Sequence, residues 1–308
     1  MIKVLAINAQ ASIQDLGRYG LRRLGIGHAG AMDRLALQAG NLLLGNPESA
    51  AAIEVALGGI TLEFTQDCAF CLTGAFYLAE LNGEIIYSYW RYYAKAGQVL
   101  QLVRAVEGMY GYICLQGGID VPEVLGSRST DLKAGFGGFQ GRALRVDDQL
   151  STFCNGKKLS CVGIAPIKMT HYIHALPSSE YAYFTRNSHY HFWHNPWVLQ
   201  SNSNRMGYRI QGDSLELNEP LEMLSHAVQF GTIQVPPSGQ PIILMADTQT
   251  TGGYPKIACV SQADLGRIAQ IRLGTAIYFQ AIDLQQANAL RQKDQIYLNQ
   301  IKRIADEN

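Results

Sequence analysis

Residues 51–64 read AAIEVALGGITLEF, two short runs rich in apolar and β-branched residues on either side of the pair Gly58-Gly59. Runs of this length, ended by turn residues, are typical of β-strands joined by tight turns. The same pattern recurs from IKVLAI at residues 2–7 to AIYFQAI at residues 276–282. The 31 glycines add the backbone freedom that barrel corners and bulges need. The sequence therefore predicts a mainly β protein with a barrel-like architecture.

Three segments carry helix signals. Each begins at an Asp or Ser whose side-chain oxygen can cap free backbone N–H groups. The third segment also has a Gln three residues after its cap, as in a capping box. These predicted helices cover residues 33–44, 261–270 and 283–304, and the last is the longest.

The chain is expected to divide near residue 155. Its 308 residues suggest two domains or one large one, because a domain usually spans roughly 100–200 residues. The least patterned stretch covers residues 151–176. We therefore predict an N-terminal β-barrel half at residues 1–155, a C-terminal β half at residues 156–282 and a helical tail at residues 283–308.

The charge balance excludes several classes of protein. Lys plus Arg and Asp plus Glu both total 25, which gives a formal net charge of zero. A nucleic-acid binder or a polybasic membrane-surface protein needs a basic excess, so we expect neither nucleic acid nor membrane as a partner. Six cysteines are too sparse for a disulfide framework and favour a reduced, cytoplasmic protein. The low charged fraction of 16% suggests that a protein partner covers part of the surface.

Several arginines lie beside glycines and small polar residues. A guanidinium next to exposed backbone N–H groups can clamp a carboxylate or a phosphate. The alternative for each arginine is that it ties a loop to backbone carbonyls. The arginines in this setting are Arg18, Arg128, Arg142, Arg205 and Arg209.

The densest group of polar residues, ADTQTTGGYP at 246–255, directly follows the apolar strand-like run PIILM. A loop at the end of a buried strand holds reactive groups on a rigid base. Asp247 could hold Mg²⁺ or act as a base, and the hydroxyl and glycine N–H groups could bind an anion. The alternative is a hydrogen-bonded turn. The candidate residues are Asp247, Gln249, Thr250, Thr251, Gly252, Gly253 and Tyr254.

Other motifs are weaker. The glycine-rich stretch 135–142 lacks the Gly-Lys-Ser/Thr ending of a phosphate-binding Walker loop, and we interpret it as a mobile surface loop in which Arg142 could bind an anion. Cys68 and Cys71 lie in a strand-like run, where residues three apart point to opposite faces. The histidines of residues 171–194 lack an acidic or Cys partner at metal-binding spacing. We therefore expect no metal site on this chain.

The ordered set of motifs resembles the 5-oxoprolinase C-subunit family, also called the KipA or allophanate hydrolase subunit 2 family, or biotin-dependent carboxyltransferase-like. The resemblance covers about residues 12–280, and the set is far more specific than any single motif. Lys168-Met169 lacks the preceding Met of a biotin-acceptor tetrapeptide, so we expect no covalent biotin. The motifs are SIQDLGRYG, GAMDRLALQAGNLLLGN, GGIDVPEVLGSRST, GGFQGR, SNRMGYRIQG, GTIQVP and GQPIILMADTQTTGGYP.

This resemblance implies tandem cyclophilin-like β-barrel folds and membership of a multi-subunit hydrolase. The implied partners are a KipI-like protein and a LamB/YcsF-like protein, which together with this chain cleave 5-oxoproline to L-glutamate with ATP hydrolysis. ATP and Mg²⁺ are then required by the complex, with no fixed place on one chain. The candidate catalytic residues are Asp247, Arg205, Arg128 and Asp15. The other candidate substrate- or anion-binding residues in the motifs are Arg18, Asp33, Ser129, Thr130, Arg142 and Arg209.

Two other functions fit the same motifs. A KipA-like regulator would sequester a KipI-like kinase inhibitor and catalyse nothing. A carboxyltransferase component of a urea-carboxylase or allophanate-type system would act on carboxybiotin carried by another chain. The sequence alone does not decide among the three.

Overall fold

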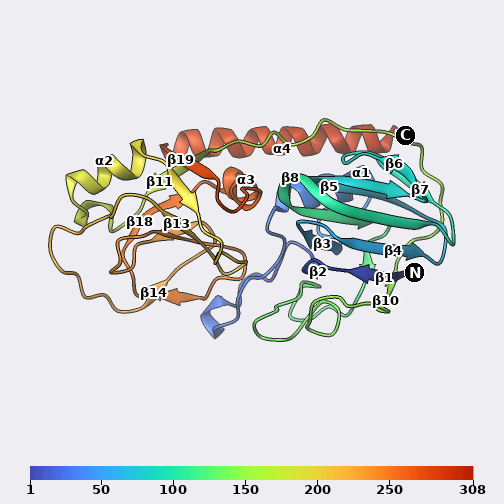
Figure 1. Ribbon diagram of the computed structural model, residues 1–308, viewed down its shortest axis with the longest axis horizontal. Helices are drawn as coiled ribbons and strands as arrows, with labels where there is room; N and C mark the ends of the chain where they lie inside the picture. Colours follow the sequence, from blue (N-terminus) through green and yellow to red (C-terminus); the bar gives the residue numbers. More distant parts are fainter. Residues whose placement is uncertain (308) are drawn as a thin grey trace. The chain divides into compact units, whose positions relative to one another are not determined.

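The computed structural model describes residues 1–307, which form two compact units (Figure 1). The N-terminal unit comprises residues 1–18, 29–168 and 295–307, and the C-terminal unit comprises residues 19–28 and 169–294. The division between the units thus comes after residue 168, later than the expected boundary at 155. The reason is that the intervening segment pairs with the N-terminal unit: Arg91 N donates to Val162 O, and Ile164 N donates to Tyr89 O, both at 2.9 Å.

In the N-terminal unit, ten strands of the described residues form one sheet. Its strand order is β2-β3-β8-β4-β1-β10-β9, and β5 pairs with β6, β7 and β8. The long antiparallel pair β5–β8 runs from Leu81 opposite Leu100 to Phe70 opposite Leu115. The strands are β1 Ile2–Ile7, β2 Ala11–Gln14, β3 Ala52–Ala56, β4 Ile60–Phe64, β5 Cys68–Leu81, β6 Glu84–Ile86, β7 Arg91–Ala94, β8 Val99–Leu115, β9 Ile119–Asp120 and β10 Gln149–Thr152.

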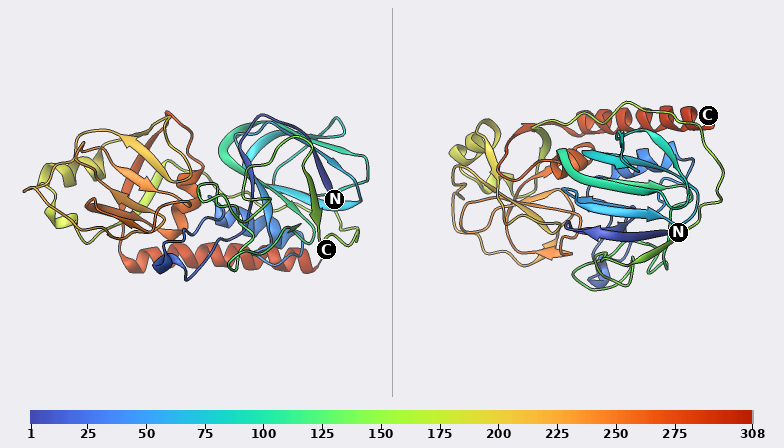
Figure 2. Two further views of the ribbon diagram at one scale, coloured as in Figure 1. Left: turned by 90° about the horizontal axis from the view of Figure 1, so that it is seen from below. Right: turned by 45° about the vertical axis from the view of Figure 1, so that its right-hand side comes forward.

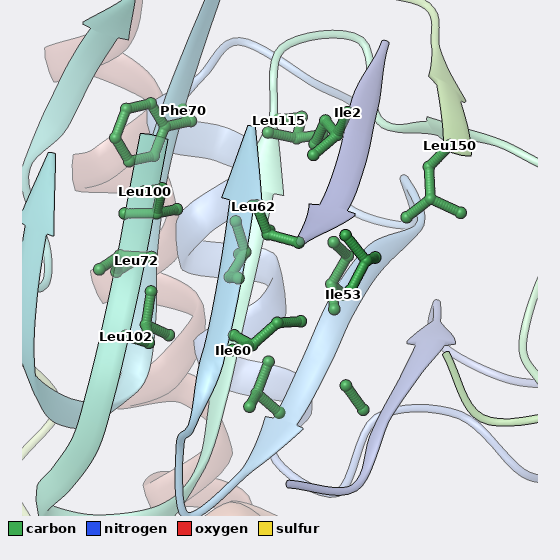
Figure 3. Close-up of a cluster of buried hydrophobic side chains, with 14 of the residues drawn as sticks. Ile2, Ile53, Ile60, Leu62, Phe70, Leu72, Leu100, Leu102, Leu115 and Leu150 are labelled. Atoms are coloured by element: carbon green, nitrogen blue, oxygen red, sulfur yellow. The ribbon is translucent and has the colours of Figure 1, made fainter. Parts of the chain in front are cut away.

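The core of this unit is formed by the apolar side chains that alternate with more polar ones along its strands. In β4, Ile60, Leu62 and Phe64 are buried, while the two residues between them are half-buried. Figure 3 shows Ile60 and Leu62 beside Leu100 and Leu102 of the neighbouring strand. Burying one such side chain stabilises the fold by about 1.5–3 kcal/mol. The alternating runs that predicted strands therefore supply the core.

The two faces of β5 explain the Cys-x-x-Cys motif. Cys68 packs in the cluster of Ile60 and Leu62, whereas Cys71 packs in a second cluster with Leu37 and Leu43 of α1 (Arg34–Leu43). The prediction that the two thiols point to opposite faces is confirmed. Within residues 1–307, no group of three or more His, Cys, Asp or Glu side chains is arranged to hold a metal ion.

In the C-terminal unit, seven strands close into a barrel of order β11-β18-β15-β16-β13-β12-β19 (Figures 1 and 2). A parallel pairing of β11 with β19, with Tyr172 opposite Tyr278, closes the ring. The strands are β11 Tyr172–Pro177, β12 Trp197–Leu199, β13 Gly207–Gln211, β15 Thr232–Gln234, β16 Ile242–Leu244, β18 Lys256–Val260 and β19 Ala276–Ala281, and a separate pair is formed by β14 His226–Ala227 and β17 Thr251–Gly252. The predicted tandem, mainly β fold is confirmed.

The three predicted helices are present. Asp33 caps α1 by accepting from Ala36 N at 3.1 Å. Asp283 and Gln286 form the reciprocal capping box, with N–O distances of 2.7 and 2.9 Å, at the start of α4 (Leu284–Asp306). The segment predicted at residues 261–270 forms a 3-10 turn, η3 (Gln262–Asp264), followed by α3 (Leu265–Ala269), without a cap bond from the preceding serine.

One helix was not predicted. Helix α2 (Arg186–His194) lies in the segment rich in His and aromatic residues, and Thr185 caps it by accepting from Ser188 N at 3.1 Å. Two further 3-10 turns are η1 (Arg22–Leu24) and η2 (Tyr181–Tyr183). None of the helices within residues 1–307 combines the length and apolar character needed to cross a membrane.

Candidate functional site

Asp15 is the centre of a hydrogen-bonded loop in the N-terminal unit. Its carboxylate accepts from Gly17 N at 2.7 Å, from Ser127 Oγ at 2.6 Å, from Ser129 Oγ at 2.5 Å and from Arg128 N at 2.5 Å. The Asp15 side chain is buried. A carboxylate that accepts from four donors is held in place by charge-assisted hydrogen bonds. The arrangement therefore fixes the loop 127–130 against Gln14 and Asp15.

Arg18 lies beneath the glycine-rich stretch 135–142. Its guanidinium donates to Ser129 O and to Val124 O and lies over the ring of Phe136, 4.6 Å from the centroid. A side chain at Gly137 would overlap Arg18 and Ser129. The stretch is a surface loop at Gly135 and Gln140, which are exposed, but it is packed at Gly137, Gly138 and Gly141, which are buried. The absence of a side chain at Gly137 lets the backbone of this stretch approach the Arg18 guanidinium closely.

Four other candidates in this unit are also engaged by neighbours. Arg142 makes a two-pronged ion pair with Asp148, with both N–O distances at 2.7 Å. Hydrogen bonding from Arg142 lowers the pKa of Asp148 below its usual value. Arg128 pairs with Glu123 at 3.2 Å. The remaining two candidates of this unit are Asp33, the cap of α1, and Thr130, which donates to Ile13 O at 3.0 Å.

In the C-terminal unit, Arg205 and Asp247 are brought together. Arg205 Nε donates to Asp247 Oδ2 and Nη2 donates to Oδ1, both at 2.8 Å. Their side chains are only 5% and 6% exposed, so the pair is shielded from water. Asp247 N also donates to Arg205 O at 2.9 Å. Because both carboxylate oxygens accept from Arg205 and the described residues offer no acidic cluster, this aspartate does not fit the ligand set of a resident Mg²⁺.

Beyond Asp247 the chain lines a cavity of about 760 Å³ within the C-terminal unit. We call this cavity the cationic pocket and define it by Arg22, Arg23, Ser178, Thr250, Thr251 and Lys256. Strand β17, which contains Thr251, pairs with β14 and forms one side of it. Two of the predicted anion-binding residues, Thr250 and Thr251, therefore line a real cavity.

The basic residues of the pocket are positioned in different ways. Arg22, on η1, donates to Val228 O at 2.5 Å and to Gln249 O at 2.7 Å. Burial lowers the pKa of the Arg22 guanidinium. Lys256 lies 3.6 Å from the carboxylate of Glu180. Arg23 is exposed and makes no hydrogen bond or ion pair with any described residue.

The other predicted residues lie apart from this pocket. Arg209 and Tyr254 line a second cavity of about 650 Å³, together with Gln200 and Gln240. Gln249 contributes its carbonyl to Arg22. Gly252 pairs with His226, and Gly253 is close to Met223 and Ser225. Residues of the ADTQTTGGYP loop thus line two separate cavities.

Sequence reasoning missed Arg22, Arg23 and Lys256. The two adjacent arginines lie in the run GLRRLG, where basic residues beside glycines were an available signal. Lys256 directly follows the last Pro of the loop motif. These three residues line one cavity only because the chain segment 19–28 packs with residues 169–294 in the fold.

Comparisons with known proteins agree with the motifs. A family model described as "Carboxyltransferase domain, subdomain A and B" matches residues 24–281. The chain is 61% identical to the 5-oxoprolinase C subunit of Haemophilus influenzae, covering 100% of this chain and 99% of that protein. The chain belongs to the 5-oxoprolinase C-subunit family. Its identity to the Escherichia coli member of the same name is 46%, with 100% of each chain covered.

The family has a structural relative in a larger enzyme. The crystal structure of the Kluyveromyces lactis urea amidolyase matches with a TM-score of 0.90 and 26% identity. The match covers 97% of this chain but only 20% of that protein. The fold of this chain thus also occurs in one fifth of the urea amidolyase chain.

Proposed function

We propose that this protein is the C subunit of an ATP-dependent 5-oxoprolinase complex that cleaves 5-oxoproline to L-glutamate. The observation that carries the proposal is the 61% identity to a 5-oxoprolinase C subunit over 99% of that protein's length. Identity that extends over the whole chain includes the loops, where binding and catalytic residues usually lie. The fold alone would not suffice, because one fold hosts many functions.

The chemistry of the reaction gives a role to cationic and hydroxyl groups that line a cavity. A lactam is a stabilised amide and a poor electrophile, and ATP supplies the phosphoryl group that activates its carbonyl oxygen. Water then adds to the carbonyl carbon, and the ring C–N bond breaks as the nitrogen takes a proton and becomes the free α-amino group. A second water hydrolyses the resulting acyl phosphate to the side-chain carboxylate of L-glutamate and inorganic phosphate. Arginine, lysine and hydroxyl groups bind and orient the anionic species in such a reaction. The cationic pocket contains all three kinds of group.

The complex, and not this chain alone, completes the site in our proposal. The partners are a KipI-like protein and a LamB/YcsF-like protein, and the complex acts in the cytoplasm. Mg²⁺ acts with ATP at the level of the complex. For ATP, the basic and hydroxyl groups of this chain are suited to phosphate oxygens. No covalent biotin is involved.

The test is reconstitution. The chain is expressed alone and together with the KipI-like and LamB/YcsF-like partners, and ADP release is measured with and without 5-oxoproline. We expect 5-oxoproline-dependent ADP and glutamate release only from the complete set, with the complex lacking this chain as the control. Robust turnover by the chain alone would disprove the need for partners. A complete complex without turnover would disprove the reaction.

A carboxyltransferase is the second candidate, favoured by the TM-score of 0.90 to a urea amidolyase. In that case the chain accepts a carboxyl group from carboxybiotin on another protein and transfers it to a small amide. Incubation with a biotin carboxylase, its biotin carrier, ATP, bicarbonate and urea distinguishes the two activities. Urea-dependent ADP release that requires this chain favours the carboxyltransferase. A stable complex with the KipI-like protein without either activity favours the KipA-like regulator.

A further inference from the structure

The cationic pocket has an unbalanced charge. Three basic residues, Arg22, Arg23 and Lys256, line it, and no acidic residue occurs among the described residues of its lining. Glu180 lies next to Lys256 and balances one of the three charges. Two positive charges therefore remain for a ligand, and a cavity lined by charges of one sign concentrates ions of the opposite sign.

We propose that the cationic pocket binds the carboxylate of a small organic acid, with Arg23 as the main charged contact. The proposal rests on the proposed function in naming that acid as 5-oxoproline. Arg23 is an exposed residue of this lining and makes no hydrogen bond or ion pair with the described chain. A guanidinium presents parallel N–H groups that match both oxygens of a carboxylate. Arg22 adds a second uncompensated positive charge to the pocket lining, because the partners that its side chain contacts are neutral backbone carbonyls.

The remaining lining suits the neutral part of such a molecule. Ser178, Thr250 and Thr251 supply hydroxyl groups that can hydrogen-bond to a lactam carbonyl or N–H. Ala227 and Val228 offer apolar surface for ring methylenes. A cleft that is partly apolar with a few polar groups is the usual form of a small-molecule site.

The same lining is poorly suited to a nucleotide. Among its described residues there is no aromatic ring to stack on a base and no carboxylate to hold Mg²⁺. A polyphosphate also favours a helix N-terminus or a glycine-rich nest, and the helical turn beside the pocket, η1, is only three residues long. The pocket chemistry therefore favours the organic acid over ATP.

Arg22 acts as a positioning residue. Its Nη2 donates to the carbonyl oxygen of Val228, which lines the pocket, and to that of Gln249, which precedes the lining residue Thr250. These bonds tie η1, and with it the adjacent Arg23, to the strand pair β14–β17. The side chain of Arg22 is thereby committed to the protein, while Arg23 is available to a ligand.

The test compares two variants that each remove one exposed arginine from the C-terminal unit. Arg23→Gln alters the pocket, and Arg186→Gln alters helix α2 outside it. Binding of 5-oxo-L-proline to the full chain is measured by ligand-observed saturation-transfer NMR. The related lactam 2-pyrrolidinone, which lacks the carboxylate, serves as the ligand control. Since losing a charge-assisted contact costs roughly a factor of ten or more, we expect at least about tenfold weaker binding for Arg23→Gln only.

The outcomes separate this inference from the function of the complex. No binding by the wild-type chain, equal binding by both variants, or equal binding of 2-pyrrolidinone each overturns the pocket assignment. In the assembled complex, Arg23→Gln should raise KM for 5-oxoproline and leave KM for ATP unchanged. An unchanged KM for 5-oxoproline in an active complex refutes the pocket while the proposed function stands. Carboxylate binding by the chain with an inactive complex refutes the function while the pocket stands.

Discussion

Arg205 and Asp247 form a two-pronged ion pair that is almost completely buried, with both N–O distances at 2.8 Å. The pair joins the loop before β13 to the loop after β16. A buried charge is tolerated only because its partner compensates the lost hydration. These two residues therefore hold the start of the ADTQTTGGYP loop, and through it Thr250 and Thr251, in place.

Asp247→Asn is expected to destabilise the C-terminal unit. The substitution removes the charge that compensates Arg205, and stranding a buried charge typically costs about 3–5 kcal/mol. The free energy of unfolding, measured in urea, should fall by up to that amount. Glu219→Gln, which alters an exposed acidic residue, is the control and should be neutral. Normal stability of Asp247→Asn with lost complex activity would instead identify Asp247 as a chemical group.

Arg205→Lys should also be damaging although the charge is kept. An ammonium cannot reproduce the two parallel hydrogen bonds that the guanidinium makes to Asp247. Losing one charge-assisted hydrogen bond costs about 1.5–3 kcal/mol, so the midpoint of urea unfolding should fall. If Arg205 only holds the loop, kcat/KM per folded complex stays unchanged. A drop of roughly 10–100-fold in kcat/KM at normal stability would mean that Arg205 contacts the substrate.

The sequence predicted those parts of the fold that depend on contacts between residues close together in the chain. The Asp283 and Gln286 capping box needs only residues three apart, and it forms as expected. Helix α2 escaped prediction because His and aromatic residues are weak helix formers and no apolar stripe marks it. The close packing of Gly137 could not be predicted, because its partners, Arg18 and Ser129, are not its neighbours in the sequence.

The candidate site shows the same limit. The sequence indicated Thr250 and Thr251, because they follow a buried strand in a polar loop. It could not indicate Arg23, since nothing local shows that residues 19–28 pack with the C-terminal unit. Nor could it show that Arg142 faces Asp148, which decides that this arginine already has a carboxylate partner. Residue type suggested the chemistry, but only the fold shows which charges are already paired.

Asp15→Asn is expected to destabilise the N-terminal unit. The carboxylate accepts four hydrogen bonds, and an amide can accept on only one of its two terminal atoms. Each charge-assisted bond lost costs about 1.5–3 kcal/mol. Urea unfolding should therefore show a large decrease, whereas Asp120→Asn at an exposed position should not. Wild-type stability of Asp15→Asn would refute its role as the centre of the loop.

Gly137 and Gly135 provide a matched test of packing. Both have φ of +71°, so alanine at either position incurs a similar left-handed strain of about 1–2 kcal/mol. A Cβ at Gly135 would meet no atom within 4 Å, whereas one at Gly137 would overlap Ser129 and Arg18. Gly137→Ala should therefore lose about 1–3 kcal/mol more than Gly135→Ala, the typical cost of overpacking. If both variants lose the same free energy of unfolding in urea, the residues around Gly137 rearrange to accommodate the added methyl group, and the packing argument fails.

The Arg142–Asp148 pair should make a measurable part of the stability depend on pH. Hydrogen bonding from Arg142 lowers the pKa of Asp148 in the folded protein, relative to about 3.9 in the unfolded chain. A group whose folded pKa is lowered stabilises the fold above the unfolded pKa, and this contribution is lost as the pH falls through the folded pKa. For a partly exposed pair we expect about 0.5–1 kcal/mol. Asp148→Asn should therefore be less stable than the wild type at pH 7, and the difference should shrink steadily below about pH 4. Urea midpoints of the two proteins measured from pH 7 to pH 3 check this, and a difference that stays constant over that range contradicts it.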